Sequence, residues 1–161
     1  MKKPVLILGI GNYLMGDEGI GVQMANLLSK EVFPEEIEIL DGGTGGFYLL
    51  EYFEQYDHIV IVDATLDEYP TGTIRLIRPK FAADFPNAMS THDIGLKDLV
   101  SALQLLNKMP DVHLFVVSIE SIQQQGVELT PEIARIIPEL RSKVLELAHR
   151  LAETKSEFML V

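Results

Sequence analysis

The feature that most constrains the fold is a series of short apolar runs that alternate with amphipathic segments along the whole chain. Residues 4–10 read PVLILGI, and residues 58–64 read HIVIVDA. Continuous apolar runs of this kind are typical of strands buried on both faces, as in parallel sheets. Between the two runs, apolar side chains recur at helical spacing over residues 19–32. The pattern therefore predicts strands that alternate with helices.

The remaining segments extend the same alternation. We expect further strands over residues 37–40, 72–79 and 112–119, and further helices over 47–53, over 96–106 and from 131 onward. Residues 72–79 alternate apolar and charged side chains, which indicates a strand near an edge of the sheet. Pro138 lies inside the apolar stripe of the last helix, so we expect that helix to kink or split there. Together the segments predict an α/β fold, in which a mainly parallel sheet carries helices on both faces.

Composition limits the partners and the location of the protein. The 161 residues fit a single domain over 1–161, and 24 acidic against 13 basic side chains give a net charge of −11. A surface this acidic repels polyphosphate, so we expect no nucleic-acid partner.

The chain has no cysteine, which excludes disulfides and thiolate metal sites. No apolar stretch approaches the roughly 18 residues needed to span a bilayer, so we expect a soluble, cytoplasmic protein with no membrane partner.

A functional site is expected at one edge of the sheet, because parallel α/β sheets place their sites beyond the carboxyl ends of the strands. The stretch GIGNYLMGDEGIGV (9–22) follows the first predicted strand, and DGGTGG (41–46) follows the second. Asp63 stands directly after the apolar residues IVIV of the third strand. His92 lies in STHDIG, in a long loop that can bring it over the same edge.

The first glycine-rich stretch has two possible interpretations. A dinucleotide-binding fingerprint would need a third glycine where Leu14 stands, and the carboxylates of Asp17 and Glu18 would repel a pyrophosphate. We expect Asp17 to act as the N-cap of the helix that follows, which leaves Glu18 for function. The glycines at 9, 11, 16, 19 and 21 would then let a substrate peptide approach the backbone.

Glu18, Asp63 and His92 together would form a metal site. Two carboxylates and one imidazole suit a hard-to-borderline metal ion and leave positions open for outside ligands. A metal held in this way can polarise a carbonyl group or lower the pKa of a bound water. The second glycine-rich stretch would hold an extended substrate chain through Asp41, Gly42, Gly43, Thr44 and Gly45.

Four motifs resemble, in order and in approximate spacing, those of the hydrogenase maturation proteases: GIGNYLMGDEGIGV, DGGTGG, IVIVDA and STHDIG. These endopeptidases trim a C-terminal extension from the precursor of the large subunit of nickel–iron hydrogenases. The resemblance implies a three-layer α/β/α sandwich around a twisted, mostly parallel five-stranded sheet of phosphorylase/hydrolase-like type. It also implies a metal position at Glu18, Asp63 and His92, with Asp41 contributing to recognition or cleavage.

The resemblance further implies an aspartic-type endopeptidase whose nickel arrives with the substrate. The catalytic set would be Glu18, Asp63, His92 and Asp41, and in the isolated protein the site would be empty or hold a surrogate divalent metal. We expect a monomer whose partner is the hydrogenase large-subunit precursor. Two alternatives stay open at this point: a nucleotide-binding oxidoreductase, and a non-catalytic adaptor that senses metal on a partner without cutting it.

Overall fold

The computed structural model describes residues 2–44, 46–80, 84, 94–120 and 126–160. Its centre is a five-stranded sheet in the order β2-β1-β3-β5-β4. The strands are β1 (Lys3–Gly9), β2 (Ile37–Asp41), β3 (Tyr56–Leu66), β4 (Ile74–Ile77) and β5 (Asp111–Ile119). Four of them are parallel to their neighbours, and β4 pairs antiparallel with β5 at one edge. The mostly parallel sheet predicted from the sequence is confirmed.

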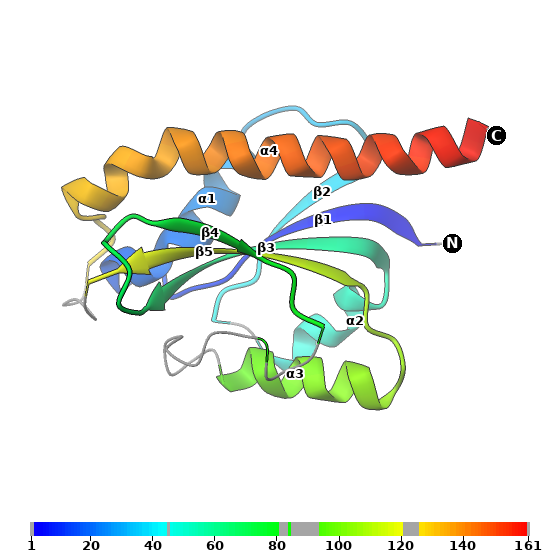
Figure 1. Ribbon diagram of the computed structural model, residues 1–161, viewed down its shortest axis with the longest axis horizontal. Helices are drawn as coiled ribbons and strands as arrows, with labels where there is room; N and C mark the ends of the chain where they lie inside the picture. Colours follow the sequence, from blue (N-terminus) through cyan, green and yellow to red (C-terminus); the bar gives the residue numbers. More distant parts are fainter. Residues whose placement is uncertain (1, 45, 81–83, 85–93, 121–125, 161) are drawn as a thin grey trace.

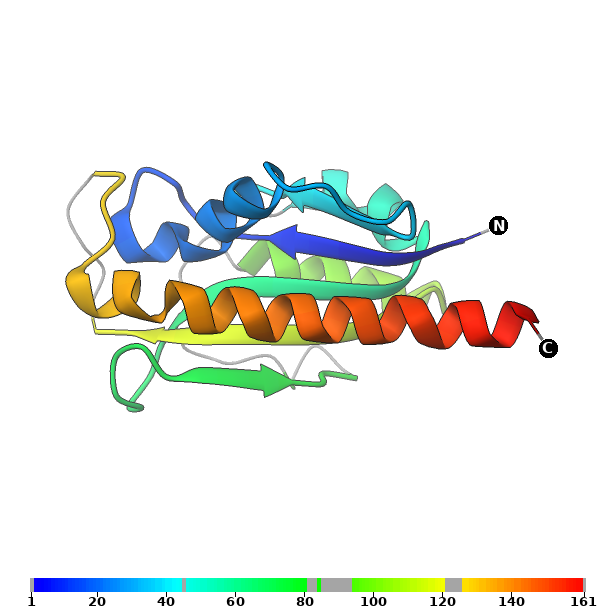
Figure 2. The same cartoon turned by 90° about the horizontal axis from the view of Figure 1, so that it is seen from above.

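Helices cover both faces of this sheet (Figure 1). α1 (Ile20–Leu28) and α4 (Pro131–Leu160) lie on one face, and α2 (Leu50–Phe53) and α3 (Ile94–Leu105) lie on the other. The 3-10 turns η1 (Gly16–Gly19) and η2 (Phe47–Leu49) lead into α1 and α2. Figure 2 shows α4 lying along the strands, with both chain termini at the same end of the molecule. The three layers confirm the expected α/β/α sandwich.

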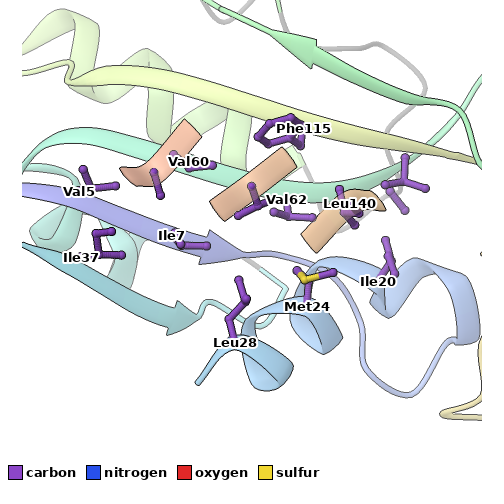
Figure 3. Packing of buried hydrophobic residues seen from close by; sticks show 14 of the residues in the cluster. Val5, Ile7, Ile20, Met24, Leu28, Ile37, Val60, Val62, Phe115 and Leu140 are labelled. Carbon is purple, nitrogen blue, oxygen red and sulfur yellow. The ribbon is translucent and has the colours of Figure 1, made fainter. Parts of the chain in front are cut away.

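Each face of the sheet has its own apolar core. On the side of α1 and α4, Val60, Val62 and Phe115 of the sheet pack with Met24 and Leu140 of the helices (Figure 3). The core on the other side combines residues of β1, β3 and β5 with residues of α2 and α3: Leu6, Leu8, Ile59, Ile61, Leu114, Phe53, Leu99, Val100 and Leu103. Neighbouring residues of one strand enter opposite cores, which is why the strands read as unbroken apolar runs.

Among the elements whose extent differs from the sequence prediction, β3 and α4 matter most for the site and the core. β3 continues to Leu66, so Asp63 lies inside the strand instead of just beyond it. The sequence predicted a kink or a split at Pro138; α4 passes through this residue as one helix, so the split does not occur. Pro138 lacks the amide hydrogen that would bond to the preceding turn, but buried Leu140 and Val144 keep this part of the helix in the core.

The backbone of α1 lies directly against the backbone of β1 and β3. A Cβ atom added to Gly21 would stand 2.0 Å from the carbonyl oxygen of Val62 and 2.3 Å from that of Ile10. A Cβ atom added to Gly9 would stand 2.1 Å from the carbonyl oxygen of Gly21. The protein's own backbone therefore fills the space beside these glycines. The prediction that Gly9 and Gly21 make room for a substrate chain is wrong.

Gly21→Ala should prevent this packing and lower the free energy of unfolding by more than about 4 kcal/mol, because a backbone carbonyl cannot move aside as a side chain can. Urea denaturation measures the loss. Gly46→Ala is the matched control, since the nearest atom to its added Cβ, Tyr48 Cδ1, would be 3.6 Å away. Equal unfolding midpoints for the two variants would contradict the role given to Gly21.

Two histidines lie beside each other near the amino ends of β3 and β5. His113 is 2% exposed, and its Nε2 atom lies 3.3 Å from Nδ1 of His58. The same Nδ1 atom of His58 lies 3.6 Å from a carboxylate oxygen of Asp111. Burial, with the positive charge of Arg78 and the neighbouring His58, lowers the pKa of His113 to about 4. His113 is therefore neutral in the folded protein near neutral pH.

The lowered pKa of His113 predicts a loss of stability in mild acid. The unfolded chain takes up a proton at this position near pH 6.5, whereas the folded chain resists it until pH is about 4. The free energy of unfolding should therefore fall by about 2 kcal/mol between pH 7.5 and 5 on account of this residue. Urea denaturation of His113→Gln at both pH values should show a smaller fall than the wild type. A variant at exposed His149 should keep the wild-type fall, and an unchanged fall in His113→Gln would contradict the assignment.

Candidate functional site

The two predicted carboxylate ligands that the structure describes are both buried at the carboxyl edge of the sheet. Asp63 in β3 is 1% exposed, and its Oδ1 atom accepts a hydrogen bond of 2.8 Å from the amide of Ala64. Glu18 in η1 is 5% exposed. The turn that carries Glu18 packs against the strand that carries Asp63. The fold thus brings together the two elements that carry these acids, although the elements are far apart in the sequence.

The main chain around Glu18 is held tightly. The Glu18 carbonyl oxygen accepts a hydrogen bond of 3.3 Å from the amide of Asn12, and the Glu18 amide donates to the Met15 carbonyl at 3.2 Å. A Cβ atom added to Gly11 would stand 2.2 Å from the same Glu18 oxygen. Gly11, like Gly9 and Gly21, makes room for the protein's own backbone and not for a substrate chain.

The carboxylate of Glu18 has no hydrogen-bond or ion-pair partner among the residues that the structure describes. An ionised carboxylate taken out of water without a partner costs several kcal/mol, and proteins normally pair such a group or bind a cation to it. With the carboxylate of Asp63 on the adjoining strand, Glu18 offers the oxygen donors that a hard or borderline divalent cation needs. These two carboxylates are of a chemical type that suits such a cation, but the described residues alone do not complete a metal site.

Asp17 does not cap α1, contrary to the prediction. The N-cap position of α1 is Gly19, and no side chain caps η1 or α1. The carboxylate of Asp17 instead accepts two hydrogen bonds of 2.8 Å from Thr130, one from its amide and one from its hydroxyl. Thr130 directly precedes Pro131, the first residue of α4 (Pro131–Leu160), and nothing in the local sequence indicates that it pairs with Asp17.

Asp41 shapes the second glycine-rich stretch. Its Oδ1 atom accepts a hydrogen bond of 2.9 Å from the Gly43 amide, and Gly43 has a φ of 56°, a left-handed conformation that favours glycine. Its Oδ2 atom accepts from the side-chain amide of Asn26 at 3.2 Å. Asn26, on α1, is a contact that sequence reasoning missed, since a single polar residue on a helix gives no signal. Asp41 is exposed at the surface, as a residue that meets a substrate must be.

The rest of the predicted substrate-binding stretch is only partly accessible. Gly42 is buried and lies beside Leu8, and Gly43 is half-buried. Thr44 is exposed, and Gly45 lies outside the described residues. The hydroxyl of Tyr48 donates to the Gly42 carbonyl, while Tyr48 as a whole is 59% exposed beside the stretch.

Backbone amides in both glycine-rich stretches donate to the protein itself. The amide of Gly11 donates to the carbonyl of Gly43 at 2.8 Å, and the amide of Gly42 donates to the carbonyl of Gly9 at 2.8 Å. The amide of Gly16 donates to the Gly126 carbonyl at 2.7 Å. A phosphate cradle needs such amides free to point at the ligand. These contacts argue against a dinucleotide site here.

Large apolar side chains are exposed around the same edge. Tyr13 and Leu14, in the loop before Glu18, are 46% and 61% exposed. Val127, which follows Gly126 next to that loop, is 44% exposed. A rim of this kind is more typical of a site that receives a polypeptide than of a small-molecule pocket.

His92, the third predicted ligand, lies outside the described residues. Among residues 2–44, 46–80, 84, 94–120 and 126–160, no three His, Asp or Glu side chains gather as a metal site. The prediction for His92 therefore stays a prediction. Within the described part of the chain, every helix is too short or too polar to span a bilayer.

Comparisons with known proteins identify a family of similar chains. A protein-family model described as hydrogenase maturation protease matches residues 22–147. The hydrogenase 2 maturation protease of Escherichia coli strain K12 is 35% identical over 144 residues, which cover 88% of each chain. The hydrogenase expression/formation protein HupD of Bradyrhizobium diazoefficiens is 35% identical over 134 residues, covering 80% of this chain and 69% of HupD.

Solved structures give the same result. The hydrogenase maturating endopeptidase HybD from E. coli superposes with a TM-score of 0.82 at 34% identity over 93% of each chain. The [NiFe] hydrogenase maturation protease HybD from Thermococcus kodakarensis superposes with a TM-score of 0.71 at 28% identity, covering 94% of this chain and 99% of that one. The fold, the acidic residues at the sheet edge and the similarity to these proteases together define a peptidase with an α/β/α fold. The chain belongs to the hydrogenase maturation protease family.

Removing the charge of Glu18 should stabilise the protein. Glu18→Gln abolishes the cost of a buried carboxylate without a partner, so we expect the free energy of unfolding at pH 7 to rise by about 0.5–2 kcal/mol. Urea denaturation without added metal measures the change. Glu51→Gln, at an exposed position on α2, should change it by less than about 0.5 kcal/mol. A clear loss of stability in Glu18→Gln would mean that its carboxylate is satisfied within the fold.

Proposed function

We propose that the protein is an endopeptidase that removes the C-terminal extension of a nickel-loaded hydrogenase large-subunit precursor. The observation that carries the proposal is the buried carboxylate of Glu18, which has no partner among the described residues and adjoins the strand of Asp63. Such a carboxylate is suited to meet a cation that arrives from outside. Membership of the hydrogenase maturation protease family supports nickel as that cation and the precursor as its carrier.

In this proposal the nickel belongs to the substrate. Glu18 and Asp63, with His92 as the third ligand, would bind open positions of the nickel ion and thereby recognise a loaded precursor. The ion would bring Lewis acidity, which can polarise a carbonyl group or acidify a bound water. The site would then be complete only when the correct substrate is present.

Asp41 is the proposed general base or direct participant in cleavage, which is the sense in which the enzyme would be aspartic-type. Its carboxylate is exposed, and hydrogen bonds from the amide of Gly43 and the side chain of Asn26 fix its direction. Each carboxylate oxygen keeps a further lone pair for a water or a peptide amide. Exposed Thr44 and the ring of Tyr48 lie beside it, where an extended tail can pass.

A non-catalytic adaptor would use the same ligands for nickel but would need no general base. The accessible and oriented carboxylate of Asp41 therefore favours cleavage over mere sensing. The internal use of the loop amides counts against the nucleotide-binding oxidoreductase. In the cell we expect the protein to act as a cytoplasmic monomer, which meets the precursor as a soluble partner.

The deciding experiment incubates the purified protein with nickel-loaded and nickel-free precursor and follows loss of the C-terminal tail by mass spectrometry. We expect cleavage of the loaded precursor alone. Glu18→Gln and Asp41→Asn should each reduce the rate by at least about 100-fold, the first by losing a nickel ligand and the second by losing a base.

Binding measurements separate the two roles. Glu18→Gln should weaken binding of the loaded precursor, whereas Asp41→Asn should bind it well and fail to cut it. Glu51→Gln, on exposed α2, should cleave like the wild type. Tight binding of loaded precursor by the wild type without any cleavage would instead establish the adaptor.

A further inference from the structure

The adjacent acids Asp17 and Glu18 have opposite environments. Asp17 is 1% exposed, and its two carboxylate oxygens accept hydrogen bonds of 2.8 Å from the amide and the hydroxyl of Thr130. Glu18 is almost as deeply buried and has no such partner among the described residues. The sequence alone does not distinguish the two, because both are acids in one short glycine-flanked turn.

Thr130 occupies the N-cap position of α4. Its carbonyl oxygen accepts a hydrogen bond of 2.8 Å from the amide of Ala134, and Pro131 begins the helix. The amino end of a helix carries a partial positive charge, so the negative charge of Asp17 is favourable there. Asp17 is thus held by a helix of 30 residues that packs along the sheet.

The segment before α4 is bound to the loop of Glu18 on both sides of that residue. The Gly126 amide donates to the carbonyl of Leu14, and the Gly126 carbonyl accepts from the amide of Gly16, each at 2.7 Å. On the other side, the side-chain amide of Gln23 on α1 donates to the carbonyl of Val127 at 2.7 Å. Thr130 and Asp17 form the contact closest to Glu18 in this set.

The turn that carries Glu18 depends on contacts with other segments of the chain to keep its geometry. Glycine stands at both of its ends, at Gly16 and Gly19, and no side chain caps it. Glycine leaves the backbone many accessible conformations, so a turn of this composition needs outside contacts to keep one geometry. The direction of the Glu18 side chain then follows from how the neighbouring residue is anchored.

We infer that Asp17 is a positioning residue, which uses its hydrogen bonds to Thr130 to hold Glu18 in the direction needed to meet the substrate's nickel. The inference rests on the proposed function. Asp17 would neither bind nickel nor transfer a proton, since its carboxylate is directed to the start of α4. The division of roles accounts for two buried acids side by side: one anchors the turn, and the other is left for the substrate.

The test uses Thr130→Val, which keeps the shape of the side chain and removes the hydroxyl that donates to Asp17. Cleavage of nickel-loaded precursor is measured well below the unfolding temperature. We expect kcat to fall about tenfold or more, because displacement of a reacting group by about 1 Å can cost two orders of magnitude. KM for the loaded precursor should rise as well, because a displaced Glu18 would bind the substrate's nickel less well. Thr130→Ser, which restores the hydroxyl, should recover most of kcat.

Ser29→Ala is the matched control. It removes a hydroxyl that donates to the Ala25 carbonyl at 2.7 Å at the far end of α1, and it should leave kcat unchanged. If Thr130→Val lowers the unfolding temperature while kcat stays at the wild-type value, Thr130 and Asp17 serve only as a helix cap and the inference is overturned.

A second measurement does not depend on cleavage. Amide hydrogen exchange of Gly16–Gly19 should be faster in Thr130→Val than in the wild type and normal in Thr130→Ser. Unchanged exchange in Thr130→Val would overturn the anchoring role. A wild-type protein that fails to cut the loaded precursor would overturn the proposed function instead, while the exchange rates would still decide whether Asp17 holds the turn.

Discussion

The backbone contact between the first turn of α1 and the strands beneath it is the constraint on which the site depends. Gly21 lies against the carbonyls of Ile10 and Val62, and the Val62 carbonyl also accepts a hydrogen bond of 3.0 Å from the amide of Ile10. Asp63 follows Val62 directly, and Glu18 precedes α1 by two residues. This close contact between backbones therefore constrains the separation of the two segments that carry the carboxylates.

At this edge, stability favours a carboxylate that is paired within the protein, whereas binding of a cation favours one that is not. Asp17 has its carboxylate satisfied by Thr130, and a satisfied buried charge does not impair the fold. Glu18 is buried without such partners among the described residues, an environment that in general disfavours an ionised carboxylate. A site that recognises a cation on its substrate requires this arrangement, because a carboxylate already paired within the protein would have to break that pair before it could bind.

The positions of the strands and the edge of the sheet that carries the site were predictable from the sequence, since both follow from local patterns. Apolar runs located the strands, and the rule that sites lie at carboxyl ends selected Asp63 and the loop of Glu18. What could not be predicted depends on contacts distant in sequence. No local pattern reports that Asp17 pairs with Thr130, 113 residues further on. Nor does a glycine reveal whether a substrate or the protein's own carbonyl lies beside it, as at Gly21.

The glycine-rich loops resemble a phosphate cradle in sequence, but they present carboxylate oxygens to a ligand instead of backbone amides. In a cradle the backbone amides point at the ligand, and here the amides of Gly11, Gly16 and Gly42 donate to carbonyls of the protein. With these three donors already engaged, the carboxylate oxygens of Glu18 and Asp41 are among the described groups that a ligand can meet at this edge. Such a surface favours metal ions and peptide amides and repels phosphates. A polypeptide tail that carries amides and lies beside a bound cation meets both requirements, which is why glycine-rich loops can serve a peptidase on a fold better known for nucleotides.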